Sequence, residues 1–305
     1  MHVVVAGSGD LARYICEEFG RAGHQLTVLT RTHKPALDLP GVHQVITDYS
    51  LSSLEPAIVD GQVLISTINN ISPAYVTIHM ALLQACQKSR TCKRLIPSEF
   101  AGDIAAYPDQ PGFYTATREP IRQALREQTN VEWTIIALGW LADYCVPAQN
   151  RYIKDIGDDC PIHMTNHSLL IPGTGSEPVD LTWARDVAKA LAVLVQSPDW
   201  EPITYMSGVR TCWNDVEEQL RARYSGQTFT SRHVSLQDIT NAIQTASEDS
   251  DAKVSAEYWL FSASHAASVP PEQVRAHRQK FFPDVYFRTL QDGLHELKED
   301  HAHIL

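Results

Sequence analysis

The fold is decided by the stretch Val3-Val4-Val5-Ala6-Gly7-Ser8-Gly9-Asp10-Leu11-Ala12, in which an unbroken apolar run leads into the pattern Gly-x-Gly-x-x-Ala. A run without polar residues indicates a buried strand that is covered on both faces. Gly7 allows a tight turn and Gly9 lets the backbone approach a pyrophosphate, while Ala12 lets the following helix, expected over residues 10–22, pack close to the strand. The free N–H groups of the first helical turn then point toward phosphate oxygens. The stretch therefore predicts a dinucleotide site with five contact residues: Gly7, Ser8, Gly9, Asp10 and Leu11.

The second predicted strand, over residues 25–30, indicates which dinucleotide is bound. A second strand at this distance favours a nucleotide site over an ordinary strand–turn–helix unit. An NAD site usually carries an acidic residue where this strand ends, because a carboxylate accepts hydrogen bonds from the ribose hydroxyls. This chain carries Arg31 there, with Lys34 close behind, and cationic groups suit the additional phosphate of NADPH. We predict NADPH/NADP+ as the cofactor; an ordinary charged surface turn is the alternative.

Strands and helices alternate through the first 138 residues. Further strands are expected over residues 42–47, 62–68, 94–97 and 132–138, and helices over residues 52–59, 71–89 and 113–128. This alternation predicts an α/β fold with a doubly wound parallel Rossmann sheet. Ligands bind at the carboxyl ends of parallel strands, so the end of the fourth strand is expected to face the cofactor through Thr67, Ile68 and Asn69.

The pattern loosens after residue 138. Residues 139–167 are rich in aromatic and polar side chains without a clear period, which is typical of a long loop that lines a substrate cleft; an ordinary irregular connection is the alternative. Four candidate substrate contacts come from this segment: Trp140, Tyr144, Tyr152 and His163. Beyond it we expect a strand over residues 169–172, helices over residues 183–196, 213–224, 236–246, 271–281 and 289–299, and a solvated tail at residues 298–303.

Length and composition limit the possible functions. A chain of 305 residues with 44% hydrophobic and 20% charged residues is typical of a globular protein. We divide it into an NADP-binding Rossmann domain, residues 1–150, and a smaller mixed substrate-binding region, residues 151–305, that is interleaved with the end of the sheet.

The charge and the cysteines indicate a compartment. A net charge of −11 opposes binding to nucleic acid and to anionic membranes, and no apolar run is long enough to span a membrane. The six cysteines are scattered and form no C-x-x-C pattern, which suits a reducing compartment. A first strand at residue 3 leaves no space for a signal peptide. We therefore expect a cytoplasmic protein with a small-molecule substrate and no metal site.

A segment after the fifth predicted strand, Leu95-Ile96-Pro97-Ser98-Glu99-Phe100-Ala101-Gly102-Asp103, resembles the Pro-Ser-Glu-Phe-Gly segment of the NmrA-like and isoflavone reductase-like families. These families are atypical short-chain dehydrogenases. Matching pieces occur in the right order: the glycine pattern, Arg31, Trp183-Ala184-Arg185-Asp186-Val187-Ala188 and Phe287-Arg288-Thr289-Leu290. The resemblance implies an NADPH-binding sheet, a substrate cleft under a variable C-terminal region, and reduction of small aromatic, phenolic or alkaloid-like molecules. Ser98 and Glu99 are expected to anchor the loop that seats the nicotinamide, with Phe100 next to them at the cofactor; a Glu99 that only caps a turn is the alternative.

The resemblance further locates the family's catalytic lysine, which lies shortly before an Ile-Arg pair. That pair is Ile121-Arg122 here, and the matching position is Arg118. A guanidinium effectively cannot donate and recover a proton, so Arg118 is expected to pair with the cofactor or to stabilise developing negative charge; an exposed helix arginine is the alternative. Tyr114 lies four residues earlier on the same helix face, where the cation is expected to lower the pKa of its phenol; a core aromatic is the alternative. Lys154 is a further candidate proton donor.

Three functions fit these residues. The first is an NADPH-dependent reductase that reduces a C=N or an activated C=C bond of a bulky aromatic or alkaloid-like secondary metabolite. The second is an NADP(H)-dependent cyclase or isomerase that couples hydride transfer to ring formation, in which orientation dominates. The third is a non-enzymatic regulator that senses NADP(H), as the NmrA regulators do. We favour the reductase because Trp140, Tyr144 and Tyr152 suit a small-molecule pocket better than a flat protein surface.

Overall fold

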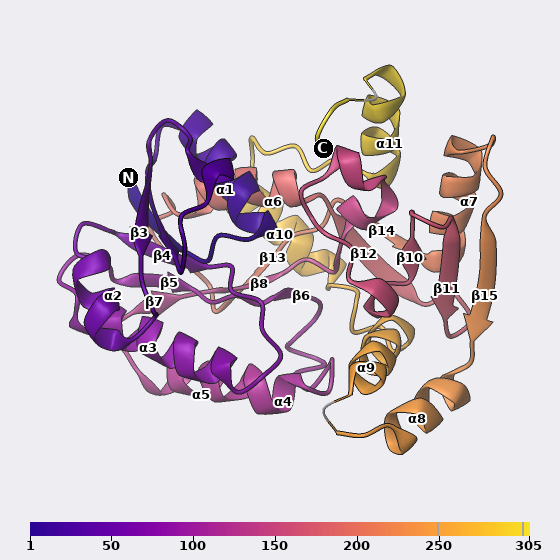
Figure 1. The fold of residues 1–305 in the computed structure, drawn as a ribbon, viewed down its shortest axis with the longest axis horizontal. Helices are drawn as coiled ribbons and strands as arrows, with labels where there is room; N and C mark the ends of the chain where they lie inside the picture. Colours follow the sequence, from indigo (N-terminus) through magenta and orange to yellow (C-terminus); the bar gives the residue numbers. More distant parts are fainter. Residues whose placement is uncertain (249, 301) are drawn as a thin grey trace.

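The computed structural model describes residues 1–248, 250–300 and 302–305. Its centre is a six-stranded parallel sheet in the order β3-β2-β1-β4-β5-β7 (Figure 1). The strands are β1 (His2–Ala6), β2 (Gln25–Thr30), β3 (Val42–Ile46), β4 (Val63–Ser66), β5 (Arg94–Ile96) and β7 (Glu132–Trp133). The order reverses next to β1, which confirms the predicted doubly wound α/β sheet.

Helices cover both faces of this sheet because the apolar side chains of β1 point to opposite sides in turn. Val3 and Val5 pack on one face, whereas Val4 and Ala6 pack on the other. In Figure 1 the two helical layers lie above and below the strands. The first layer contains α1 (Asp10–Arg21) and α6 (Ala184–Leu194), and the second contains α2 (Leu51–Ala57), α3 (Ala74–Lys88) and α5 (Glu119–Glu127).

Two predicted elements are broken in the structure. The strand over residues 132–138 is divided into β7 and β8 (Ile135–Ala137), and β8 pairs with β13 (Ile203–Tyr205) and β6 (Phe100–Ala101). The helix over residues 113–128 is divided into α4 (Tyr114–Thr117) and α5, with Arg118 at the junction. Pro120 causes this second break, because it has no N–H to donate to the preceding turn and its ring crowds that turn's carbonyl.

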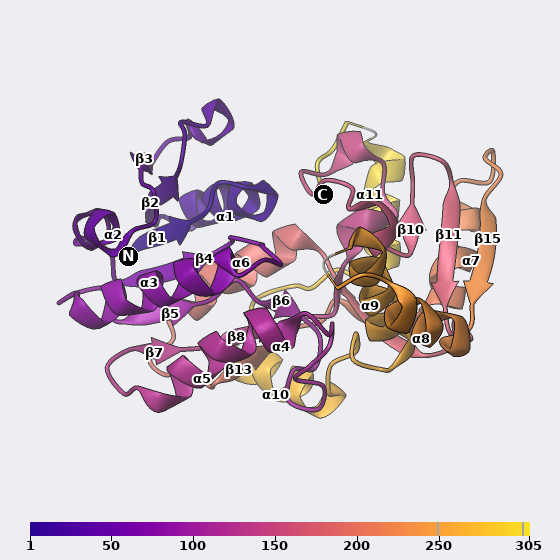
Figure 2. The same cartoon turned by 60° about the horizontal axis from the view of Figure 1, so that its bottom comes forward.

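The C-terminal region contains more strands than the sequence pattern predicts. One small sheet consists of β9 (Trp140–Leu141), β12 (Pro178–Thr182) and β14 (Val209–Cys212), and another of β10 (Ile162–His163), β11 (Ser168–Pro172) and β15 (Thr230–Val234). The helices of the region are α7 (Trp213–Arg223), α8 (Leu236–Thr245), α9 (Asp251–Ala263), α10 (Pro271–Phe281) and α11 (Leu290–Glu299). Both views place the sheet of β10, β11 and β15, with α7 to α9, on the side of the molecule away from β3 (Figures 1 and 2). Of these strands, only β11 was expected, because β9 and β10 have two residues each and polar or charged residues interrupt β12, β14 and β15.

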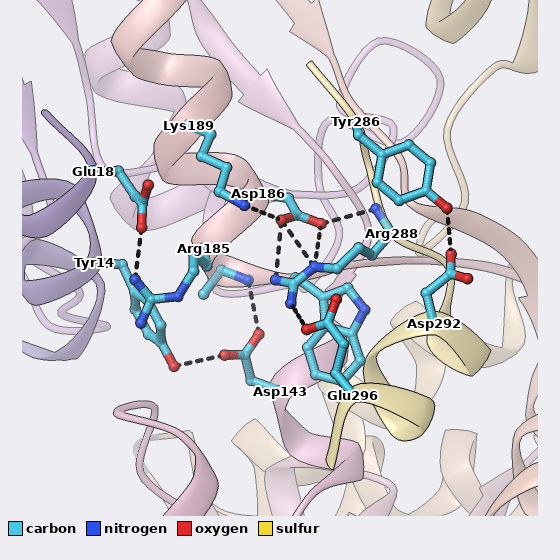
Figure 3. Close-up of polar contacts among 12 residues, drawn as sticks. Tyr14, Glu18, Asp143, Arg185, Asp186, Lys189, Tyr286, Arg288, Asp292 and Glu296 are labelled. Atoms are coloured by element: carbon cyan, nitrogen blue, oxygen red, sulfur yellow. Dashed lines mark hydrogen bonds and ion pairs between the residues drawn. The ribbon is translucent and has the colours of Figure 1, made fainter. Parts of the chain in front are cut away.

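Two segments that carry the family resemblance contact each other (Figure 3). The Arg288 guanidinium lies 3.0 Å from the carboxylate of Asp186, and both side chains are buried. Arg288 also pairs with Glu296 at 2.6 Å, and the Trp183 indole N–H donates to the carbonyl of Thr289 at 2.9 Å. These contacts hold the last helix, α11, against the start of α6.

The end of the chain returns to the protein after a short exposed stretch. Ala302 and His303 are exposed, in line with the expected solvated tail, whereas position 301 lies outside the described residues. Leu305 is fully buried, and its N–H donates to the carbonyl of Asn150 at 3.0 Å. The C-terminal residue therefore packs against the segment that follows β9.

Candidate functional site

The glycine turn after β1 has the geometry that a nucleotide site requires. Gly7 has a φ of +106°, and a Cβ there would lie 2.7 Å from Thr67 Oγ1. A Cβ on Gly9 would meet no heavy atom within 4 Å, so the backbone at this position stays accessible to a ligand. Ser8 Oγ lies 2.8 Å from Thr30 Oγ1, which ties the turn to the end of β2. α1 begins at Asp10, and its first N–H groups are available for phosphate oxygens.

Lys154 lies beside this turn. Its backbone N–H donates to Asp10 Oδ2 at 2.9 Å, and its ammonium group is 3.7 Å from Asp10 Oδ1. The lysine side chain is exposed. An acidic residue in the first helical turn would repel a pyrophosphate, and the cation of Lys154 offsets that charge. The structure thus brings Lys154 to the glycine turn, and no contact joins it to Tyr114 or Arg118 in the described chain.

Arg31 and Lys34, at the end of β2, have exposed cationic groups. Neither side chain forms an ion pair or a hydrogen bond with the residues that the structure describes. The Arg31 guanidinium lies 5.8 Å from the ring centre of Tyr49, and the backbone of Lys34 is held by the side-chain amide of Gln44. At the end of β2, two cationic groups thus have no hydrogen-bond or ion-pair partner among the described residues and are open to an anionic ligand.

The end of β4 is joined to Arg118. Arg118 Nη2 donates to Asn69 Oδ1 at 3.0 Å, and Nη1 donates to the carbonyl of Asn70 at 2.6 Å. Arg118 is 2% exposed, so it is not the exposed helix arginine that the sequence left open. Thr67 and Ile68 are half-buried at the same edge of the sheet.

Aromatic rings enclose the Arg118 guanidinium. Its central carbon lies 4.0 Å from the ring centre of Tyr75 and 4.9 Å from that of Tyr114, and cation–π attraction stabilises such an arrangement. Its Nε has no hydrogen-bond acceptor among the described residues. Burial raises the pKa of Tyr114 to about 12 although Arg118 acts in the opposite direction, so the expectation of a lowered pKa is wrong.

The Ser98–Phe100 segment is fixed from both sides. The Tyr75 hydroxyl donates to the Ser98 carbonyl at 3.0 Å, and the Ser98 N–H donates to His79 Nε2 at 3.3 Å. Burial lowers the pKa of His79 to about 3, so the imidazole is neutral and can accept. Glu99 forms a buried ion pair with Arg122 of α5, with Nε to Oε1 at 2.9 Å. Phe100 starts β6 and is half-buried. These contacts give the segment a rigid position at the carboxyl edge of the sheet.

Trp140 and Tyr144 approach the same cluster from the other side. The Trp140 ring lies 6.2 Å from that of Tyr144 and 5.6 Å from that of Tyr258, and Tyr258 lies 5.4 Å from Phe113. Phe113 in turn lies beside Tyr114 and Arg118. Tyr258 belongs to α9, which the sequence pattern did not predict. The only available signal was the cap-like Ser250 before an alanine-containing apolar stretch, because the helix has no clear polar face.

Tyr152 and His163 make different contacts. The Tyr152 hydroxyl donates to Glu17 at 2.7 Å, and its ring lies under the guanidinium of Arg13, so it packs along the side of α1. His163 is in β10, with Nε2 3.9 Å from Asp158. The structure therefore does not join these two residues to Trp140 and Tyr144 through any contact that it describes.

Within residues 1–248, 250–300 and 302–305, no group of three or more His, Cys, Asp or Glu side chains is arranged to hold a metal ion. Among the helices of the same residues, none combines the length and the apolar character needed to cross a membrane.

The sheet and the glycine turn define a Rossmann-type protein, and similarity to individual known proteins shows its family. No family model matches the chain. It is 53% identical to oxidoreductase swnR of Arthroderma benhamiae over 98% of both chains, and 52% identical to oxidoreductase swnR of Metarhizium robertsii over 100% of both. It is 24% identical to phenylcoumaran benzylic ether reductase POP1 of Populus trichocarpa, over 95% of this chain and 96% of that one.

Solved structures show the same fold. A ternary complex of leucoanthocyanidin reductase from Vitis vinifera superposes with a TM-score of 0.75 at 18% identity, covering 97% of this chain and 99% of that one. AtPrR2 with NADP+ and (+)-pinoresinol superposes with a TM-score of 0.73 at 18% identity, covering 96% and 97%. The chain belongs to the NmrA-like, isoflavone reductase-like family of oxidoreductases, which confirms the resemblance read from its sequence.

Proposed function

We propose that this oxidoreductase is an NADPH-dependent reductase of a bulky aromatic or alkaloid-like secondary metabolite. The observation that carries the cofactor assignment is the pair of unpartnered cations, Arg31 and Lys34, beside the glycine turn. A 2′-phosphate gives both cations a partner, whereas the ribose hydroxyls of NADH do not. The NADP+ in the AtPrR2 complex and the NADPH in a leucoanthocyanidin reductase complex support the same assignment.

The residues around the turn would divide the work of holding the dinucleotide. Gly7, Ser8, Gly9, Asp10 and Leu11 would surround the pyrophosphate, with Lys154 offsetting the charge of Asp10. The nicotinamide would lie at the carboxyl edge of the sheet, against Thr67, Ile68, Asn69, Ser98, Glu99 and Phe100. NADPH supplies a hydride when bound there.

Arg118 and Tyr114 would act on the acceptor. Arg118 keeps a fixed positive charge in a water-poor setting, and its Nε–H is free to interact with an atom that gains negative charge. Tyr114, with a pKa of about 12, stays protonated near neutral pH and can donate a hydrogen bond. Trp140 and Tyr144 would contact the body of the substrate, while Tyr152 and His163 would contribute only through the segments that they support. A conjugated C=C or a C=N bond suits this set, because neither needs a strong acid for hydride uptake.

A cyclase or isomerase is the second candidate. It is favoured by one observation, namely that Arg118 replaces the lysine that would exchange protons at neutral pH. In that reaction the aromatic enclosure would act through orientation of the reacting atoms.

Further proposals concern the organisation of the chain. We propose that residues 1–150 hold the cofactor and that residues 151–305, with Trp140 and Tyr144, complete the substrate site. A cytoplasmic location is supported by the six cysteines, which are all free and of which five are buried.

The test uses purified protein with candidate aromatic and alkaloid-like intermediates and NADPH that carries deuterium at C4 in either the pro-R or the pro-S position. A reductase transfers deuterium from one of the two labelled forms into the product and consumes the cofactor stoichiometrically. A cyclic product without net cofactor consumption would instead identify the second candidate. Binding of NADP(H) without turnover of any intermediate would contradict both and favour a sensor.

A further inference from the structure

α9 brings Tyr258 close to the aromatic residues that surround Arg118, namely Tyr75, Phe113 and Tyr114. Tyr258 is not among the proposed catalytic and substrate residues. The ring of Tyr258 lies 5.4 Å from Phe113, edge to face, and 5.6 Å from Trp140. Phe113 precedes α4, and Trp140 belongs to β9. Tyr258 therefore lies between the segment that contains Phe113 and Tyr114 and the segment that contains Trp140 and Tyr144, and it contacts a ring in each. Two ring neighbours fix the direction of its side chain.

The hydroxyl of Tyr258 has no hydrogen-bond partner within the described part of the chain. Three other tyrosines donate to a protein acceptor: Tyr14 to Asp143, Tyr49 to the carbonyl of Leu29, and Tyr75 to the carbonyl of Ser98. The buried hydroxyl of Tyr224, by contrast, also has no partner among the described residues. The side chain of Tyr258 is half-buried and its hydroxyl is not sealed from water, so a ligand that enters from solvent can reach it. A ligand oxygen can then take the place of water as the acceptor of this O–H.

The neighbouring phenols strengthen this conclusion. Tyr114 and Tyr144 also lack a hydrogen-bond acceptor among the residues described. Phe113 lies 5.2 Å from Tyr114 and Trp140 lies 6.2 Å from Tyr144, measured between ring centres, so the three phenols belong to one series of ring contacts. Burial raises the pKa of the Tyr258 phenol well above its ordinary value, so the group is a hydrogen-bond donor at any working pH.

The helix that carries Tyr258 is held in place by its neighbour. The carboxylate of Glu257 accepts the backbone N–H of Phe113 at 2.8 Å, and a Cβ on Gly112 would come within 2.8 Å of the same carboxylate. The start of α4 and the middle of α9 are thus in direct contact. A donor held by a rigid support loses little freedom when a ligand binds.

We propose that Tyr258 is a substrate-contacting, specificity-determining residue whose hydroxyl donates a hydrogen bond to a carbonyl or hydroxyl oxygen on a flat, conjugated ring system. The proposal rests on the proposed reductase function, because it places the substrate beside Arg118. Phe113 and Trp140 orient the ring of Tyr258, so its hydroxyl can bond only a molecule that carries an oxygen at the matching position. A ring compound of the same size without that oxygen leaves the phenol unpaired, which lowers its affinity.

The test measures equilibrium binding to the protein saturated with NADP+, so that it does not depend on turnover. The probes are coumarin, which carries a conjugated carbonyl, and 1,2-dihydronaphthalene, a bicyclic hydrocarbon of similar size. Replacing Tyr258→Phe removes the oxygen and keeps the ring. We expect coumarin affinity to fall about three- to tenfold, the effect of one hydrogen bond, and dihydronaphthalene affinity to change by less than about twofold.

Tyr286→Phe is the matched control, since Tyr286 is 69% exposed and its hydroxyl bonds Asp292, away from this cluster. Thermal unfolding of each variant shows whether the fold is kept. Equal losses for both probes, no loss for either, or failure of the unsubstituted NADP+ complex to bind coumarin would each overturn the assignment of Tyr258. A failed deuterium transfer with intact, Tyr258-dependent coumarin binding would overturn the reductase function alone.

Discussion

The sheet around β1 and the region beyond β8 depend on contacts of very different sequence separation. The glycine turn, the first turn of α1 and Arg31 all lie within the first 31 residues, and β1 pairs directly with β2. In the C-terminal region Arg288 binds Asp186 across 102 positions, and Trp140 binds Ser262 across 122. The glycine turn and Arg31 are therefore encoded by a local pattern, whereas the contacts of the C-terminal region are made by pairs that no local pattern reveals.

The largest effect is expected from breaking a long-range pair. Asp186→Ala leaves the buried Arg288 guanidinium without its main partner, and an uncompensated buried charge costs about 3–5 kcal/mol of unfolding free energy. Urea denaturation measures the loss, and Glu272→Ala, which breaks an exposed pair with Arg275, should cost less than about 1 kcal/mol. If both variants lose the same small amount, the C-terminal region does not depend on this pair.

The Arg118→Ala variant tests whether the charge of Arg118 contributes to catalysis. If Arg118 stabilises the reacting atoms as proposed, removing its fixed charge should lower kcat by about 100- to 1000-fold. Steady-state kinetics with a turned-over substrate measures the effect, and the thermal midpoint checks the fold. Arg126→Ala is the control, because Arg126 lies on α5 and pairs with Glu119 at the surface. An unchanged kcat in Arg118→Ala would show that Arg118 has only a structural role, namely its hydrogen bonds to Asn69 and Asn70.

A pH titration sharpens the comparison through Asp143, which links the two regions. Burial raises the pKa of this carboxyl from 3.8 to about 6, so the folded protein holds a proton that the unfolded chain has released between these values. This contribution to stability is therefore complete below pH 3.8 and is lost as the pH rises through 6, by up to about 3 kcal/mol. Unfolding free energies of the protein and of Asp143→Asn, measured from pH 4 to pH 7, should diverge in this direction. Parallel curves would contradict the raised pKa.

The smallest effect is expected at the exposed end of β2. Arg31→Ala should weaken NADPH binding by about 10- to 100-fold and leave NADH binding within about twofold, because only the former carries the 2′-phosphate that the guanidinium would contact. Isothermal titration calorimetry with both dinucleotides measures the difference. Arg90→Ala, which removes another exposed arginine, is the control. Equal losses for the two dinucleotides would remove Arg31 from the cofactor site.

Much of the central sheet, but little of the aromatic cluster around Arg118, could be predicted from the sequence. The six-stranded sheet followed from alternating strands and helices, and the role of Gly7 followed from the tight turn that a Cβ would obstruct. The break at Arg118 was readable from Pro120 but concealed by the helical spacing around it. The lowered pKa expected for Tyr114 was wrong because burial outweighs a neighbouring cation, and the degree of burial is a tertiary property. Tyr258 could not be found, because its neighbours Phe113 and Trp140 are more than one hundred positions away.

Tyr14 has a consequence for the order in which ligands act. Its hydroxyl accepts the N–H of Tyr152 at 2.9 Å. The same hydroxyl donates to Asp143 (Figure 3), so one atom connects α1 with the residue next to Tyr144. The first-turn amides of α1 lie about one turn before Tyr14. If a dinucleotide shifts this helix, the displacement is transmitted to the aromatic wall, and thermodynamic reciprocity then requires that an occupant of the wall changes dinucleotide affinity by the same factor.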